Sequence, residues 1–278
     1  MSVTLYPFQI GNFKCYALLD GHIYGKAEQF FVGPTEEERA AVLEKAGIQP
    51  DKVPSFFTPL FIDTGKHRIL VDTGVGEEDS EDYGFVRKNL ASIGLNFDDI
   101  DLLIISHAHA DHIGLNTTVD GMPMFPNARY LISKDEWYHW TDPHNLANVN
   151  FHTPHIRKNL LGIADRFEQI NHENEIVPGI RLLKAPGHTP GHAVIQIFSN
   201  GEHLIYAADA LLNPLHLEFL GWNYHSDADK MAAIESRRRI ARLAVETDAL
   251  VMGYHFACPG IGHIVETDDG WRWQPTDA

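Results

Sequence analysis

The segment from Ser106 to His112 reads S-H-A-H-A-D-H, and it places four potential metal ligands within six residues. It directly follows the apolar run 102–105. Such a run is typical of a strand buried on both faces of its sheet, so the cluster falls on the loop at the strand's carboxyl end. Open α/β sheets bind ligands there. So short a loop cannot place all four ligands around one tetrahedral ion, and two neighbouring ions are the easier geometry.

Further side chains that commonly bind metals follow three later strand-like runs. His188 follows residues 180–184, Asp209 follows 204–207, and His255 follows 249–252. Glycines at 187 and 191 allow the backbone to turn sharply near His188. Because each side chain follows a predicted strand, the fold can bring them together with the first cluster. Imidazoles and carboxylates in this ratio favour Zn²⁺, with Mn²⁺, Fe²⁺ and Co²⁺ as alternatives.

The order of predicted elements favours an α/β fold in one domain spanning residues 1–278. Strands are expected at residues 5–10, 14–19, 55–63, 67–72, 130–132, 180–184, 193–198, 204–207 and 249–252. Helices are expected at residues 34–46, at 80–93 ending before Gly94, around 137–140, and at 227–246, where the carboxylate of Asp227 opens the helix. The alternation of strands and helices after residue 80, behind a strand-rich start, predicts sheets packed on each other with helices outside. Residues 26–53 are interpreted as an insertion on the β core.

Composition argues against several classes of partner. The formal charge is −16, from 22 basic and 38 acidic residues, and a surface of this kind repels nucleic acid. No apolar run approaches the length needed to span a bilayer, and no signal peptide is visible. The two cysteines exclude a disulfide framework, which favours a cytoplasmic location. A homodimer is left open.

The ordered set H-x-H-x-D-H, then His188, Asp209 and His255, resembles the metallo-β-lactamase superfamily over almost the whole chain. The resemblance implies an αββα sandwich, in which two mixed sheets pack face to face with helices outside, and two divalent ions at one edge. It assigns His107, His109 and His188 to the first ion, Asp111, His112 and His255 to the second, and Asp209 to both. It also implies that Asp72, in I-L-V-D-T-G, orients a ligand histidine.

Departures from the pattern narrow the subgroup. The chain has Asp209 where the main broad-spectrum β-lactamases have cysteine, and His109 where flavodiiron proteins have glutamate. RNA-processing members would show a basic surface, which this chain lacks. Residues 253–264 look closest to the branch holding methyl parathion hydrolase and quorum-quenching lactonases. Many of those lactonases place a substrate-contacting tyrosine where this chain has Leu212, and the nearest polar candidates are Asn213 and His216.

The resulting hypothesis is a dimetal hydrolase in which a metal-bridged hydroxide attacks a lactone or related ester, with N-acyl homoserine lactone favoured. Asp111 or Asp209 would protonate the leaving alkoxide, and His216 is a third candidate catalytic residue. The alternatives are a promiscuous phosphotriesterase or arylesterase, a glyoxalase II-like thioesterase, and a metal-stabilised protein that only binds. The substrate would be a small molecule with an apolar portion. Six aromatic residues are interpreted as its pocket, or else as core or a dimer interface: Phe30, Phe31, Phe56, Phe57, Trp222 and Tyr224.

Overall fold

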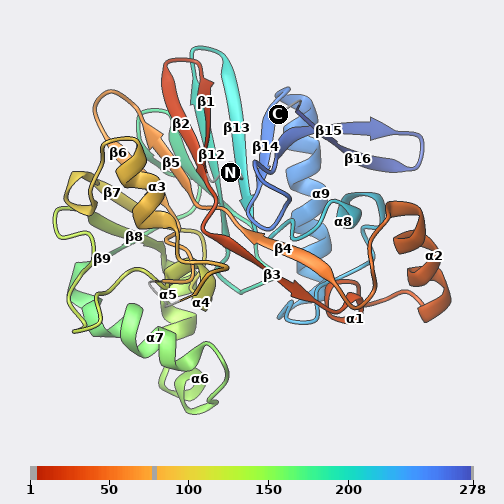
Figure 1. Cartoon of the computed structure of the whole chain (residues 1–278), viewed down its shortest axis with the longest axis horizontal. Helices are drawn as coiled ribbons and strands as arrows, with labels where there is room; N and C mark the ends of the chain where they lie inside the picture. Colours follow the sequence, from red (N-terminus) through yellow and green to blue (C-terminus); the bar gives the residue numbers. More distant parts are fainter. Residues whose placement is uncertain (1–4, 77–79, 277–278) are drawn as a thin grey trace.

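Most strands of the protein belong to two seven-stranded sheets that pack face to face, with helices on their outer sides (Figure 1). The structure is a computed structural model that describes residues 5–76 and 80–276. The strands of the first sheet, in spatial order, are β1 (Leu5–Ile10), β2 (Phe13–Leu18), β5 (Leu60–Asp63), β6 (Arg68–Val71), β7 (Leu102–Ile105), β8 (Arg129–Ser133) and β9 (Phe167–Ile170). Those of the second are β10 (Glu175–Val177), β11 (Ile180–Lys184), β12 (Ala193–Ser199), β13 (Glu202–Ala208), β14 (Leu250–Gly253), β15 (Ile261–Thr267) and β16 (Gly270–Pro275).

The helices lie between and after these strands. They are α1 (Ala27–Phe30), α2 (Glu36–Ala46), α3 (Val86–Ser92), α4 (Ala110–Ile113), α5 (Lys134–Thr141), α6 (Pro143–Ala147), α7 (Thr153–Asn159), α8 (Leu215–Glu218) and α9 (Lys230–Glu246), with 3₁₀ turns at Phe97–Asp99 and Leu161–Arg166. No helix of the described ranges is both long and apolar enough to cross a membrane.

Both sheets are mixed, and their parallel pairs determine where ligands can gather. Strands β6, β7, β8 and β9 run parallel in the first sheet, and β13 runs parallel to β14 in the second. Carboxyl ends of parallel strands meet at one edge of a sheet. The loops after β6, β7, β13 and β14 therefore come together. Strand β11 runs in the same direction as β13, since both are antiparallel to β12, so its loop ends at the same edge. The loops after β7, β11, β13 and β14 carry the residues expected to bind metal.

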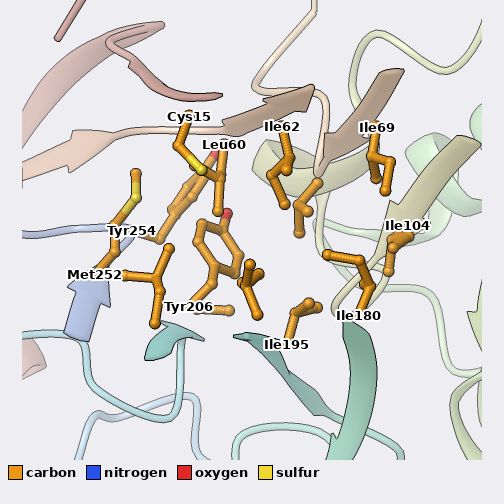
Figure 2. Close-up of a cluster of buried hydrophobic side chains, with 14 of the residues drawn as sticks. Cys15, Leu60, Ile62, Ile69, Ile104, Ile180, Ile195, Tyr206, Met252 and Tyr254 are labelled. Atoms are coloured by element: carbon orange, nitrogen blue, oxygen red, sulfur yellow. The ribbon is translucent and has the colours of Figure 1, made fainter. Parts of the chain in front are cut away.

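The main core lies between the two sheets (Figure 2). The sequence of β7 is apolar throughout because both faces of the strand are buried. Leu102 and Ile104 face this core, while Leu103 and Ile105 face the helices on the other side. Figure 2 shows Ile62, Ile69 and Ile104 of the first sheet opposite Ile180 and Ile195 of the second. The αββα sandwich expected from the resemblance is confirmed.

Separate apolar layers attach the helices. On the first sheet, α3 and α7 contribute Val86, Leu90 and Ile156 to a buried cluster. On the second, α9 contributes Ile240, Ala241 and Ala244, which pack with Ile205 and Val251. The helices thus cover the outer faces of the two sheets, and the carboxyl ends of the strands are left open for the site.

Residues 26–53 connect a two-stranded ribbon formed by β3 (Gly21–Gly25) and β4 (Val53–Phe57). They contain α1 and the predicted helix α2. Thr35 caps the first turn of α2, because its hydroxyl oxygen accepts a hydrogen bond from the backbone N–H of Glu38. A small buried cluster that includes Phe30, Phe31 and Leu43 fixes this segment against the chain near Trp222. In Figure 1 the ribbon and these helices extend to one side of the sandwich.

Three predicted boundaries are wrong. The strand expected at 55–63 is two strands, since β4 joins the ribbon and β5 joins the first sheet. The helix expected from Ser80 begins at Val86, because Tyr83 bridges to Gly21 and the Asp20 carboxylate accepts the N–H of Val86. The long helix α9 is capped by Asp229 rather than Asp227.

Candidate metal centre

The backbone is strained at two positions beside the site. Asp72, after β6, has φ of 58° and Ala208, just before Asp209, has φ of 44°. Non-glycine residues rarely adopt this region, and such strain gathers at functional sites because the surrounding structure must enforce it. Here the turns aim the side chains that follow β6 and β13 across the edge of the sheets.

The carboxylate of Asp209 lies at the centre of the site. Its Oδ2 is 3.2 Å from Nε2 of His188 and 3.1 Å from Nε2 of His255, and its Oδ1 is 3.0 Å from Nε2 of His112. The Nε2 atom of His107 lies 3.7 Å from Oδ2. One carboxylate therefore faces imidazoles delivered by both sheets.

The candidate ligand atoms form two groups, each with its members within 4.8 Å of one another. The first is His107, His109, His188 and Asp209, and the second is Asp111, His112 and His255. The resemblance implies the same division of the other six residues, and it assigns Asp209 to both groups. All seven predicted ligands are brought together, and all except the half-buried Asp111 are buried.

Hydrogen bonds at Nδ1 orient three of the imidazoles. His112 donates to Asp72 at 2.8 Å, His188 to Asp227 at 2.9 Å, and His255 to the carbonyl oxygen of Phe56 at 2.9 Å. An acceptor at Nδ1 requires the proton there, which leaves the lone pair of Nε2 directed into the site. The expected contact of Asp72 with a histidine is confirmed.

Asp72 also organises the start of the ligand loop. Its Oδ1 accepts the backbone N–H of Ser106 at 2.8 Å, and its Oδ2 accepts the hydroxyls of Ser106 at 2.7 Å and Tyr206 at 3.0 Å. The Ser106 hydroxyl oxygen in turn lies 3.1 Å from Nδ1 of His107. One buried carboxylate thus positions both His107 and His112.

The donor set fits divalent cations. Within the described residues, Nε2 of His107, Nε2 of His112 and Oδ1 of Asp209 are buried and make no hydrogen bond, which is costly unless a cation binds them. Burial and the neighbouring imidazole of His112 hold the pKa of His107 well below its usual value. Although burial acts in the opposite sense, the imidazoles around Asp209 hold its pKa well below the usual range. Neutral imidazole at His107 beside ionised carboxylate at Asp209 is the combination that a metal ion requires. At His112 and His188, although burial acts in the opposite sense, Asp209 and other carboxylates raise the pKa, so a metal ion would have to displace a proton from each ring.

A buried carboxylate that the sequence did not reveal joins two of the ligand loops. Oε1 of Glu136, on α5, accepts the backbone N–H of Ala108 at 2.9 Å, and Oε2 accepts the Thr189 hydroxyl at 2.6 Å and the N–H of Gly191 at 3.1 Å. Gly191 packs directly on α5, where a Cβ atom would lie 1.9 Å from the backbone nitrogen of Glu136. The glycine is therefore required for close approach.

The candidate centre opens into a cavity of about 620 Å³. His109, Asp111, His188, Asp209 and His255 lie in its wall. Of the aromatic residues expected there, Phe30, Phe57 and Tyr224 line it, whereas Phe31 and Trp222 belong to a neighbouring apolar cluster. Ile23, Tyr24 and Phe151 also line it, and all three are exposed.

The position of His216 does not support a catalytic role. Its ring is buried beside Phe31, and its Nε2 lies 2.8 Å from the carbonyl oxygen of Phe30. The side chain thus ties α8 to α1, outside the cavity wall. Leu212 does reach the cavity, where its side chain offers no hydrogen bond.

Several supporting residues escaped sequence reasoning because they come from unrelated elements. Asp227, taken as a helix cap, binds His188, and Ser55 lies 2.9 Å from Nδ1 of His255. His192 is buried and its Nε2 accepts the backbone N–H of Asp209 at 3.1 Å. The P-G-H-T-P-G-H repeat was a visible signal for His192, but Asp227 and Ser55 had none.

Residues 59–254 match the model of the metallo-beta-lactamase superfamily. An N-acyl homoserine lactonase of a Bacillus species is 25% identical over 239 residues, which cover 77% of this chain and 83% of the relative. The structure of AidC, a dizinc quorum-quenching lactonase in complex with a product, N-hexanoyl-L-homoserine, superposes with a TM-score of 0.90 at 26% identity and covers 99% of this chain and 98% of that one. A hydrolase of the β-lactamase superfamily, AbOPH, shares the fold with a TM-score of 0.91 at 24% identity, over 100% and 99% of the two chains.

A sandwich of two mixed sheets with a histidine and aspartate cluster at one edge defines a metal-dependent hydrolase of the αββα class. The chain belongs to the metallo-beta-lactamase superfamily, within its lactonase-like branch.

Proposed function

We propose that this enzyme opens the ring of N-acyl homoserine lactones, using two divalent metal ions. The observation that carries the proposal is the convergence of seven candidate ligands from four strand ends at one edge of the sheets, where five of them lie in the wall of one cavity. The likeness to AidC over nearly the whole of both chains supports a lactone as substrate.

The residues that would hold the ions are the two groups around Asp209, and Zn²⁺ is the favoured metal. Bound ions of this kind would lower the pKa of a water molecule and polarise the lactone carbonyl. The protein's own contribution is to orient the imidazoles of His112, His188 and His255 through Asp72, Asp227 and the Phe56 carbonyl.

Asp111 is the carboxylate best placed to move a proton. Its side chain is 24% exposed, against 3% for Asp209, and it lines the cavity. Its Oδ2 lies 3.6 Å from Nε2 of both His112 and His255. When the acyl C–O bond of the ring breaks, Asp111 would deliver to the leaving oxygen the proton taken from the attacking water.

The apolar part of the substrate would lie along the aromatic side of the cavity. Phe30, Phe57 and Tyr224 form its inner wall, and the exposed side chains of Ile23 and Phe151 form its rim. A pocket with apolar walls and a few convergent polar groups suits an acyl chain attached to a polar ring.

The decisive experiment combines elemental analysis of the purified protein with hydrolysis assays on N-acyl homoserine lactones, aryl esters, phosphotriesters and thioesters. About two zinc ions per chain and lactone turnover that is lost with chelation and restored with Zn²⁺ are expected. Turnover confined to phosphotriesters, aryl esters or thioesters would reject the lactone as substrate. If the protein bound no metal and showed no turnover, the interpretation of this site as a catalytic metal centre would be rejected.

A further inference from the structure

His152 occupies the N-terminus of α7 and reaches the wall of the same cavity. Its ring stacks on that of His109 with 3.9 Å between centroids and 14° between planes. His109 belongs to the first ligand group, whereas His152 belongs to neither group. The side chain is therefore beside the candidate centre without being one of its proposed ligands.

A backbone hydrogen bond fixes which nitrogen of His152 carries the proton. The N–H of Ala110, between His109 and Asp111, donates to Nδ1 of His152 at 3.2 Å. A nitrogen that accepts a hydrogen bond has no proton, so the ring is neutral and the proton is on Nε2. The ligand loop thus selects the tautomer of a residue from another helix.

The Nε2–H group is left available to the cavity. Within residues 5–76 and 80–276, the bond at Nδ1 is the one hydrogen bond made to this ring. The ring shares the cavity wall with Asp111 and Asp209. It is a preorganised donor, since its stack on His109 and its bond to Ala110 hold it before any substrate arrives.

On the basis of the proposed lactonase function, we propose that Nε2–H of His152 donates a hydrogen bond to the lactone carbonyl oxygen. That oxygen gains negative charge as the water oxygen bonds to the carbonyl carbon, and the hydrogen bond strengthens in step. His152 keeps its proton throughout. The charge returns to the ring oxygen when the acyl C–O bond breaks, and a separate group protonates that oxygen.

The test compares His152→Phe with His152→Gln in the zinc-loaded enzyme. Phenylalanine preserves a ring against His109 but has no donor, whereas glutamine restores an N–H group. Loss of one oxyanion donor typically lowers kcat by roughly 100-fold or more. We expect that loss in His152→Phe, with KM changed by less than about threefold, and partial recovery in His152→Gln. His144→Phe, which makes the same exchange at an exposed position of α6, is the matched control and should behave as wild type.

Two readouts separate this role from a structural one. Zinc content should equal that of wild type in every variant, because His152 is not a ligand. Nitrogen-15 NMR of the zinc-loaded wild type should show His152 protonated at Nε2. Protonation at Nδ1, or an unchanged kcat in His152→Phe, would overturn the inference while leaving the lactonase proposal intact. A wild-type enzyme that binds zinc but opens no lactone would overturn both.

Discussion

Glu136 accepts a hydrogen bond from the backbone N–H of Ala108 at 2.9 Å, which ties a buried carboxylate of α5 to the loop that carries His107 and His109. The same carboxylate accepts hydrogen bonds from the loop of His188 and from the indole N–H of Trp140 at 2.6 Å. Three of the proposed ligands therefore depend on one side chain that lies outside the ligand groups.

Replacing Glu136 with Gln should weaken zinc binding. The amide group has one acceptor oxygen, so its NH₂ must face donors that now bind the second carboxylate oxygen. We expect a fall in zinc affinity of about 10- to 100-fold, the usual effect of losing a partner behind a metal ligand. The affinity is measured by competition with a chelator. Asp135→Asn, at an exposed position on the same helix, is the control, and equal losses in both variants would contradict the assigned role.

Asp227 and Asp229 should give opposite results when each is replaced with Ala. Asp227 binds Nδ1 of His188, so its loss should lower zinc affinity by about 10- to 100-fold. Asp229 caps α9 by accepting the backbone N–H groups of Met231 and Ala232, so its loss should lower the free energy of unfolding by about 1 kcal/mol. Zinc titration and denaturant unfolding measure the two effects. The assignment fails if Asp229→Ala is the variant with the larger loss of zinc.

Asp209→Ala should abolish lactone hydrolysis and reduce bound zinc while the fold survives. Its carboxylate lies within 3.2 Å of nitrogens of His112, His188 and His255, so its removal leaves three imidazoles without their shared partner. Circular dichroism checks the fold, and elemental analysis checks the metal. Turnover equal to that of wild type would remove Asp209 from the mechanism.

Phe151→Ser should alter the preference for acyl chain length. Phe151 is 75% exposed at the cavity rim, where it would cover the far end of a long chain. Each buried methylene contributes about 0.8 kcal/mol, so loss of the contact should raise KM for decanoyl more than for butanoyl homoserine lactone. Met122→Ser, an exposed apolar residue outside the cavity wall, is the control. A uniform rise in KM across chain lengths would argue against a rim contact.

The sequence was sufficient to predict the fold and to name the candidate ligands, because both depend on local patterns. The run 102–105 fixes a doubly buried strand, and ligands that follow strands must meet where parallel strands end. The residues that support the ligands could not be predicted, because their roles depend on contacts that are not local in the sequence. Glu136 and His152 act across distant segments, and nothing in their neighbouring sequence marks their partners.

Errors at element boundaries have a similar cause. Asp227 and Asp229 are equally good helix caps by sequence, and the choice is made by His188, which binds one of them. Likewise, the start of α3 is set by Asp20, a residue far earlier in the chain. His216 looked available for catalysis because its partner, the carbonyl of Phe30, belongs to a segment whose placement could not be derived.

Each sheet is built from a continuous stretch of chain, the first ending at Ile170 and the second beginning at Glu175. The first stretch supplies His107, His109, Asp111 and His112, and the second supplies His188, Asp209 and His255. Neither stretch holds a complete ligand group. If the chain were cut within residues 171–174, each fragment would be inactive by itself. Hydrolysis would return only when the two fragments associate, so it would measure their association.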